Sequence, residues 1–166
     1  IIAGVFSQAV VNDLDNKNSS AIITNNSFEF PTKSLKAVND SFQLFPGFPV
    51  IGSFTTYAPK TGGIMCNLDA DPEEEIVFGC GTVLYALNID GSNVTGWPYN
   101  FPSNYEMSWA PASGDIDGDG QIEIVATAGG STGGNLYAFE KDGSLVNGFP
   151  IVFGKFPLGA TLSDLN

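Results

Sequence analysis

Residues 136–150 read LYAFEKDGSLVNGFP, and two earlier stretches of the chain have the same internal spacing. Residues 84–98 read LYALNIDGSNVTGWP, and residues 35–49 read LKAVNDSFQLFPGFP. The prolines that close the three copies lie 49 and 52 residues apart. A period of this length is typical of four-stranded propeller repeats, so the sequence predicts a repeat protein.

The local signals within a repeat are those of strands and tight turns. Residues 75–78, 123–128 and 135–139 are short runs rich in β-branched or aromatic residues, bounded by glycines or polar residues. Asp-Gly pairs at residues 90–91 and 142–143 separate apolar runs and predict hairpin turns. No long window keeps a helical period free of Gly and Pro. We therefore expect an all-β fold with almost no helix.

Each repeat also closes with a Gly-aromatic-Pro sequence. Proline has no N–H to donate to a strand ladder, so we expect it to end the outer strand of its repeat. The aromatic residue before it is expected to pack sideways against a neighbouring repeat.

The predicted architecture is a β-propeller type built from four-stranded antiparallel blades. We expect about three blades of a larger propeller, with repeats at about residues 1–49, 50–98 and 99–150 and the start of a fourth at 151–166. The acidic segment that precedes each repeat begins again at Asp164, 151 residues after Asp13. We therefore expect the natural polypeptide to extend beyond both ends, with further blades or self-association covering the end faces.

The acidic segment before the third repeat has the spacing of a cation-binding loop. Asp115, Asp117 and Asp119 occupy positions one, three and five, the backbone carbonyl near Gln121 is at position seven, and Glu123 is at position nine. Ca²⁺ accepts about six to eight oxygen ligands in a flexible geometry, whereas Mg²⁺ prefers a stiffer octahedron. An EF-hand is excluded because position twelve is an alanine within a strand-like run. The spacing predicts a Ca²⁺ site.

The second repeat has a similar loop. Its ligand positions are taken by Asn67, Asp69, Asp71, Glu73 (through its carbonyl) and Glu75. Pro72 replaces the turn glycine and restricts the backbone there. We expect this loop to bind Ca²⁺ as well.

The loop of the first repeat departs from the pattern. Asp13 and Asp15 remain, but Lys17 and Ala21 stand at positions five and nine. A lysine ammonium at a ligand position takes the place of the cation. We expect this loop to be free of metal.

These motifs together resemble the FG-GAP or VCBS-type repeats of secreted bacterial proteins, which are related to the propeller of integrin α-subunits. The resemblance rests on the string at residues 115–125, followed by residues 136–139 and 148–150. It implies a β-propeller whose hairpin loops hold Ca²⁺ on one face, and a location outside the cell or on its surface.

Composition restricts the function further. Eighteen acidic residues face six lysines, with no arginine and no histidine, which gives a formal net charge of −12. Such a chain offers no basic surface for nucleic acid and no imidazole for catalysis. No apolar run approaches the length of a membrane span.

Two other groups of residues were considered for chemistry. Cys66 and Cys80 are expected to be buried thiols rather than a disulfide. A hairpin closed by residues 67–75 places Cys66 opposite Ile76, and the Cα atoms of the two cysteines are then too far apart for a disulfide bond. Four residues in the stretch between the second and third repeats indicate either a stacking platform for sugar or peptide, or packing between repeats: Trp97, Tyr105, Glu106 and Trp109.

The leading functional prediction is a non-catalytic, Ca²⁺-stabilised propeller segment that acts in adhesion or in recognition of a protein or carbohydrate. The alternative is part of a calcium-dependent propeller enzyme that acts on polysaccharides, similar to the rhamnogalacturonan lyases. That chemistry normally needs a basic side chain at the reacting carbon, and this segment offers only scattered lysines.

Overall fold

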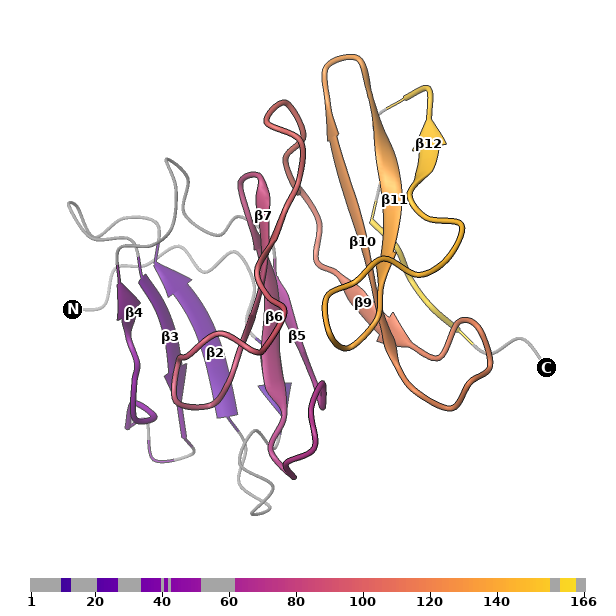
Figure 1. The fold of residues 1–166 in the computed structure, drawn as a ribbon. Helices are drawn as coiled ribbons and strands as arrows, with labels where there is room; N and C mark the ends of the chain where they lie inside the picture. Colours follow the sequence, from indigo (N-terminus) through magenta and orange to yellow (C-terminus); the bar gives the residue numbers. More distant parts are fainter. Residues whose placement is uncertain are drawn as a thin grey trace.

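The computed structural model describes residues 10–12, 21–26, 34–39, 41, 43–51, 62–155 and 159–163. Within this part of the chain all regular structure is β-strand, which confirms the all-β prediction. The strands form three four-stranded antiparallel sheets, and in each sheet neighbouring strands follow one another in chain order (Figure 1). The described residues include no helix long and apolar enough to cross a membrane.

The first sheet contains β1 (Val10–Asn12), β2 (Ala21–Asn26), β3 (Ser34–Val38) and β4 (Val50–Ile51). The second contains β5 (Gly63–Cys66), β6 (Glu75–Cys80), β7 (Val83–Leu87) and β8 (Tyr99–Asn100). The third contains β9 (Ala112–Gly114), β10 (Glu123–Gly130), β11 (Gly133–Phe139) and β12 (Ile151–Phe153).

The repeated sequence pattern has the same structural place in each sheet. Its opening four residues lie in the third strand, which is β3, β7 or β11. The Asp-Gly pairs then make the turns toward the outer strands β8 and β12, with Gly91 at φ 80° and Gly143 at φ 78°. These conformations favour glycine over any residue with a Cβ. The turn predictions at both sites are confirmed.

The prediction that proline ends the outer strand is wrong. Pro49, Pro98 and Pro150 each stand immediately before the outer strand of their sheet, which is β4, β8 or β12. Proline at the start of an edge strand costs no ladder hydrogen bond, which is the physical reason for this position. Each sheet therefore ends a few residues beyond the Gly-aromatic-Pro sequence.

The sheets pack face to face, and alternation along the strands of the second sheet gives each face its own core. Ile76 and Phe78 of β6 belong to a cluster shared with Leu35 and Ala37 of the first sheet. Val77 of β6 belongs instead to a cluster shared with the third sheet. Phe48 and Trp97 are buried in these clusters, so the aromatic residue of Gly-aromatic-Pro does pack between sheets.

The first strands of successive sheets also meet, because β1 contacts β5 and β5 contacts β9. In Figure 1 the three sheets accordingly stand side by side in chain order. The described sheets do not close into a ring.

The hairpin of β5 and β6 differs by one residue from the expected register. Cys66 lies opposite Glu75, not Ile76, because Glu75 already belongs to β6 and only residues 67–74 form the loop. Cys66 and Cys80 are nevertheless both buried thiols, as predicted, and lie in different clusters on opposite faces of the second sheet.

Candidate metal centres

The two acidic loops of the described chain occupy equivalent places. One joins β5 to β6 and the other joins β9 to β10, at the same end of their sheets (Figure 1). Each loop ends at a glutamate that is also the first residue of the following strand. Glu75 is 1 % exposed and Glu123 is 0 % exposed, so the two carboxylates are among the few buried charged groups of the described chain.

In the third repeat the loop gathers three carboxylates. Oxygens of Asp115, Asp117 and Glu123 lie within 4.8 Å of one another, close enough to hold one metal ion. Backbone amides fix the first aspartate, because Gly118 donates to its Oδ1 at 2.6 Å and Gly120 to its Oδ2 at 3.0 Å. Both glycines have positive φ, which turns their N–H groups into the loop.

Glu123 supplies the feature that most strongly indicates a bound cation. Its Oε2 accepts a hydrogen bond of 2.7 Å from the N–H of Ile116. Its Oε1 is buried and has no hydrogen-bond partner. A buried carboxylate oxygen without a partner is costly, and a cation at the centre of the triad would satisfy it.

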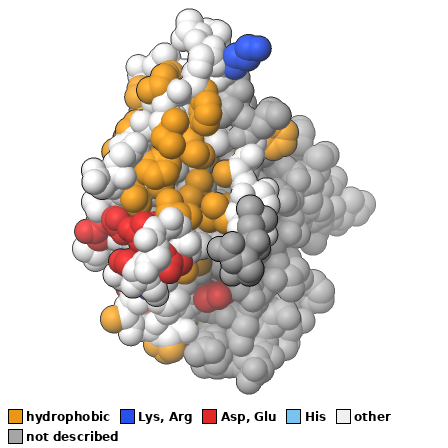
Figure 2. Space-filling view, turned by 90° about the vertical axis from the view of Figure 1, so that its right-hand side faces the viewer, with side chains coloured by type: hydrophobic (Ala, Val, Ile, Leu, Met, Phe, Trp, Pro, Cys, Tyr) orange, Lys and Arg blue, Asp and Glu red, His pale blue; other side chains and the backbone are white. Residues whose placement is uncertain are grey.

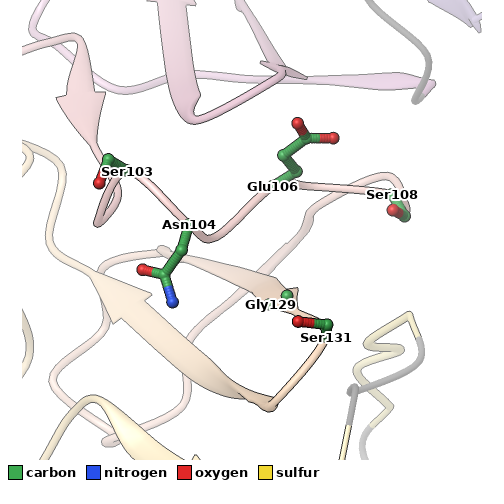
Figure 3. A pocket seen from close by; sticks show the side chains of 7 residues that line it. Ser103, Asn104, Glu106, Ser108, Gly129 and Ser131 are labelled. Atoms are coloured by element: carbon green, nitrogen blue, oxygen red, sulfur yellow. The ribbon is translucent and has the colours of Figure 1, made fainter.

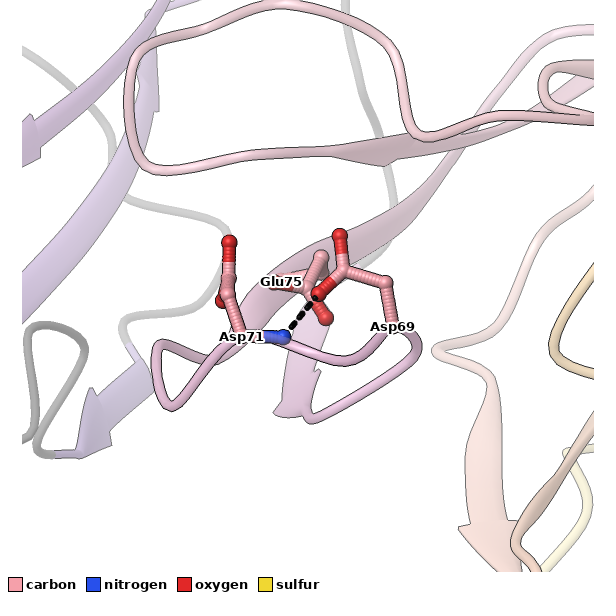
Figure 4. Close-up of side chains that lie close together, drawn as sticks. All are labelled: Asp69, Asp71 and Glu75. Carbon is pink, nitrogen blue, oxygen red and sulfur yellow. Dashed lines mark hydrogen bonds between the residues drawn. The ribbon is translucent and has the colours of Figure 1, made fainter.

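The loop of the second repeat gathers a different set of positions. The carboxylates of Asp69, Asp71 and Glu75 lie within 4.8 Å of one another (Figure 4). The N–H of Asp71 donates to Oδ1 of Asp69 at 3.0 Å, and the N–H of Leu68 donates to Oε2 of Glu75 at 2.5 Å. Two separate loops therefore each hold a triad that could bind a metal ion.

Asn67 stands at position one of the second loop, where the third repeat has Asp115. Its Nδ2 donates to the carbonyl oxygens of Asp71, at 2.6 Å, and of Glu73, at 3.2 Å. The Glu73 carbonyl is the backbone ligand that the sequence predicts for this loop. The amide group of Asn67 therefore competes with a cation for that oxygen.

The sequence predicted one set of positions for both loops, and the structure brings together two different subsets. The third-repeat triad uses positions one, three and nine, and the second uses three, five and nine. Asp119 lies outside its triad and accepts hydrogen bonds from the backbone N–H and the side chain of Gln121. The first acidic loop, with Asp13, Asp15 and Lys17, lies outside the described residues.

Sequence spacing does not reveal that the glutamate closes each loop from inside. The signal available was an apolar residue at position two, Leu68 or Ile116. Leu68 is 3 % exposed, and Ile116 packs against the cluster of the third sheet. Anchoring of this residue holds its N–H next to the glutamate carboxylate.

Burial, together with nearby acidic groups, alters the pKa of Glu75 in the second loop. Burial, with the charges of Asp69, Asp71 and Glu74, raises the pKa of Glu75 to about 7, although its hydrogen bond from Leu68 opposes the shift. Burial and the neighbouring Glu75 carboxylate also raise the pKa of the Cys66 thiol to about 12. A cation in this loop would oppose the first of these shifts, because positive charge stabilises the ionised carboxylate.

The aromatic residues considered for a stacking platform do not lie on one surface. Trp97 is buried and donates from Nε1 to the carbonyl of Lys141 at 2.9 Å, and Tyr105 packs against the same cluster. Trp109 is 46 % exposed. Packing between repeats, the second alternative from the sequence, therefore accounts for Trp97 and Tyr105.

A polar hollow lies at the end of β10 opposite Glu123. Its lining includes Ser103, Asn104, Glu106, Ser108 and Ser131, and it contains no basic side chain (Figure 3). Glu106 and Gly129 exchange two backbone hydrogen bonds of 2.9 and 3.1 Å, which hold the connection between β8 and β9 beside β10. The sheet thus places the acidic loop and the polar hollow at opposite ends.

Comparison with known proteins gives no assignment, because neither a protein-family model nor a curated protein matches this chain. The repeat geometry and the two carboxylate triads are therefore what point to a function.

Proposed function

We propose that this protein is a calcium-binding, β-propeller-type repeat segment of a secreted or cell-surface protein, similar to the FG-GAP and VCBS repeats. Its role is adhesion or recognition of a protein or carbohydrate, without catalysis. The observation that carries the proposal is the unpartnered, buried Oε1 of Glu123, a residue whose carboxylate lies within 4.8 Å of the Asp115 and Asp117 carboxylates.

The donor set favours Ca²⁺ over other metals. Every side chain in the two triads offers a carboxylate oxygen, and hard oxygen donors suit Ca²⁺ and Mg²⁺ rather than zinc or copper. The two triads use different positions of similar loops, and Ca²⁺ tolerates such variable geometry better than Mg²⁺. A net charge of −12 also raises the local concentration of divalent cations around the protein.

The arrangement of the sheets supports the propeller type. Three four-stranded antiparallel sheets follow one another, with their first strands in contact and their faces packed through hydrophobic clusters. Propeller blades have this strand number, and their first strands line the centre of the ring.

A scaffold role in recognition follows from where the loops lie. Cations bound at one end of successive sheets would stiffen the loops there. At the other end of β10, the hollow beside Glu106 offers hydroxyl, amide and carboxylate groups that suit a neutral or cationic polar ligand. Extracellular modules bind Ca²⁺ with Kd values of about 10⁻⁴–10⁻³ M, so weak sites of this kind would be filled outside the cell.

The test is thermal unfolding of the full chain in chelator and in millimolar Ca²⁺. A ligand that binds only the folded state stabilises it by about 2.7 kcal/mol at 100 times its Kd. We expect Asp117→Ala to remove most of the Ca²⁺-induced rise in the melting midpoint.

Asp142→Asn is the matched control. Asp142 is exposed in a turn outside both triads, and asparagine can keep the hydrogen bond that its Oδ1 accepts from the N–H of Ser144. This variant should respond to Ca²⁺ as the parent does. Superimposed melting curves of the parent with and without Ca²⁺ would refute the proposal.

A further inference from the structure

Five pairs in the sequence place a glycine directly after an aspartate or an asparagine. Four are Asp-Gly pairs, at residues 90–91, 117–118, 119–120 and 142–143, and the fifth is Asn147-Gly148. Glycine has no Cβ to shield its backbone nitrogen, so this nitrogen can reach Cγ of the preceding side chain. An asparagine attacked in this way loses its amide as ammonia, which makes asparagine a thermally labile residue. Whether the attack occurs depends on what holds the glycine nitrogen.

In all four Asp-Gly pairs a hydrogen bond holds the backbone nitrogen of the glycine. The N–H of Gly91 donates to the carbonyl of Asn88, and the N–H of Gly143 donates to the carbonyl of Glu140, both at 2.9 Å. The two glycines of the third-repeat acidic loop donate instead to the Asp115 carboxylate, at 2.6 and 3.0 Å. Each of these nitrogens must lose its hydrogen bond before it can turn toward the preceding side chain.

The Asn147-Gly148 pair differs from the other four. None of the hydrogen bonds among the described residues involves the N–H of Gly148. Both residues are exposed, and a Cβ on Gly148 would meet nothing within 4 Å. The turn around the pair is closed by one hydrogen bond, from the N–H of Phe149 to the carbonyl of Val146 at 3.1 Å. Opening of this single bond frees the pair to react, and such local opening needs no unfolding of the sheet.

The exposure of the pair is a property of this turn in every repeat. The equivalent residues are Pro46 and Gly47 in the first repeat and Thr95 and Gly96 in the second, and all four are exposed. They remain exposed although the turn of the following sheet lies against each of the two glycines. Only the third repeat has an asparagine at this position.

From these differences we propose that Asn147 is a site of spontaneous covalent modification, which is deamidation through a cyclic imide formed with Gly148. The backbone nitrogen of Gly148 bonds to Cγ of Asn147 and the bond from Cγ to Nδ2 breaks. Nδ2 leaves as ammonia and takes up the proton that the glycine nitrogen gives up. Water then opens the ring. Attack of water at Cγ gives an aspartate, and attack at the main-chain carbonyl carbon gives an isoaspartate.

The two products have different consequences for the third sheet. Either product adds one negative charge to the net charge of −12. The isoaspartate also adds a methylene group to the main chain between Val146 and Phe149. Both residues pack in the hydrophobic cluster on the outer face of the sheet, and Figure 2 shows hydrophobic side chains gathered above acidic ones on this side of the molecule. We therefore expect the isoaspartate, but not the aspartate, to destabilise the sheet.

The test follows amide loss in the full chain, incubated folded in chelator at mildly alkaline pH and mapped by mass spectrometry. Asp142→Asn supplies a matched pair, because it places an asparagine before Gly143, whose N–H is held by Glu140. In this folded variant we expect amide loss at residue 147 to be about ten times faster than at position 142, the factor that one retained hydrogen bond provides. In urea the two positions should react at similar rates.

Thr95→Asn transfers the reactive pair to the second repeat. The N–H of Gly96 is likewise in none of the hydrogen bonds among the described residues, so this position should react about as fast as Asn147. Asn147→Thr has the residue of the second repeat and should abolish the acidic species that anion exchange separates from the aged parent. Equal rates at positions 142 and 147 in the folded variant would overturn the proposal. Faster amide loss at another asparagine of the described chain would overturn it as well.

An isoaspartyl methyltransferase identifies the fraction that contains isoaspartate, and urea unfolding of the separated fractions measures its effect. The isoaspartate fraction should unfold at a lower urea concentration than the parent, and the aspartate fraction at an unchanged one. Equal midpoints for all fractions would overturn the structural consequence. None of these measurements involves Ca²⁺ or a residue of the two triads, so their outcome is independent of the proposed function.

Discussion

The carboxylate of Glu123 accepts a 2.7 Å hydrogen bond from the N–H of Ile116, across the neck of the loop between β9 and β10. Glu75 and Leu68 form the same bond at 2.5 Å in the preceding repeat. One carboxylate oxygen of each glutamate therefore closes its loop, and in Glu123 the other oxygen is buried without a hydrogen-bond partner. These two roles explain why each triad includes a glutamate at the start of a strand.

The two loops are expected to differ in affinity. Calorimetric titration with Ca²⁺ should resolve two binding events, the tighter one in the loop of Glu123. In the loop of Glu75 the side-chain amide of Asn67 already donates a hydrogen bond to the Glu73 carbonyl oxygen. A cation must displace this hydrogen bond to bind the same oxygen, so its affinity for the loop is lower. Glu123→Gln should therefore abolish the tighter event and Glu75→Gln the weaker one. The opposite assignment would contradict this account of Asn67.

The glycines of two Gly-aromatic-Pro sequences, Gly96 and Gly148, differ in whether a turn of another sheet lies against them. Gly96→Ala should destabilise the protein more than Gly148→Ala, although both positions have similar positive φ values of 88° and 93°. Gly148→Ala costs only backbone strain, about 1–2 kcal/mol. Gly96→Ala adds a collision with the Asp142 carbonyl, so its cost in urea unfolding should be larger. Equal costs would mean that the contact between the sheets is absent in solution.

The stability of the metal-free protein should depend on pH through Glu75. Its pKa is raised to about 7 in the folded state, so the folded chain holds a proton that the unfolded chain has released. The contribution of this group is fully present below a pH of about 4.5 and is lost as the pH rises through about 7. Urea unfolding in chelator at pH 5 and pH 8 measures the effect.

Glu75→Gln serves as the control for this pH dependence, because its side chain has no charge to lose. The difference between pH 5 and pH 8 should be smaller in this variant than in the parent. In saturating Ca²⁺ the parent should lose less stability between pH 5 and pH 8 than it does in chelator, since a bound cation favours the ionised carboxylate. An identical pH dependence of parent and variant would exclude Glu75 as the titrating group.

Both thiols should resist alkylation in the folded protein. Cys66 and Cys80 are 6 % and 1 % exposed, and the raised pKa of Cys66 leaves little thiolate at pH 8. Mass spectrometry after iodoacetamide treatment should show no label until denaturant is added and two labels afterwards. Rapid labelling of the native protein would show that the faces of the second sheet open easily.

Much of the fold was predictable because its signals are local. The turn glycines at residues 91 and 143 and the alternating strands follow from backbone preferences over a few residues. The position of the prolines just before the outer strands was predicted wrongly, because proline is equally compatible with either end of an edge strand. Only the pairing of β4, β8 and β12 with their neighbours distinguishes these positions.

By itself, the sequence determined the period of the repeat, the all-β class and the two acidic loops, since each depends on spacing along the chain. Tertiary structure decided which carboxylates meet, because Asp71 joins the triad of the second loop whereas its counterpart Asp119 lies outside the triad of the third. It also decided that Cys66 faces Glu75, and that Phe153 stays exposed where Phe101 is covered. These outcomes depend on the backbone conformation of each loop and on the packing between sheets, and the spacing of residues along the chain specifies neither.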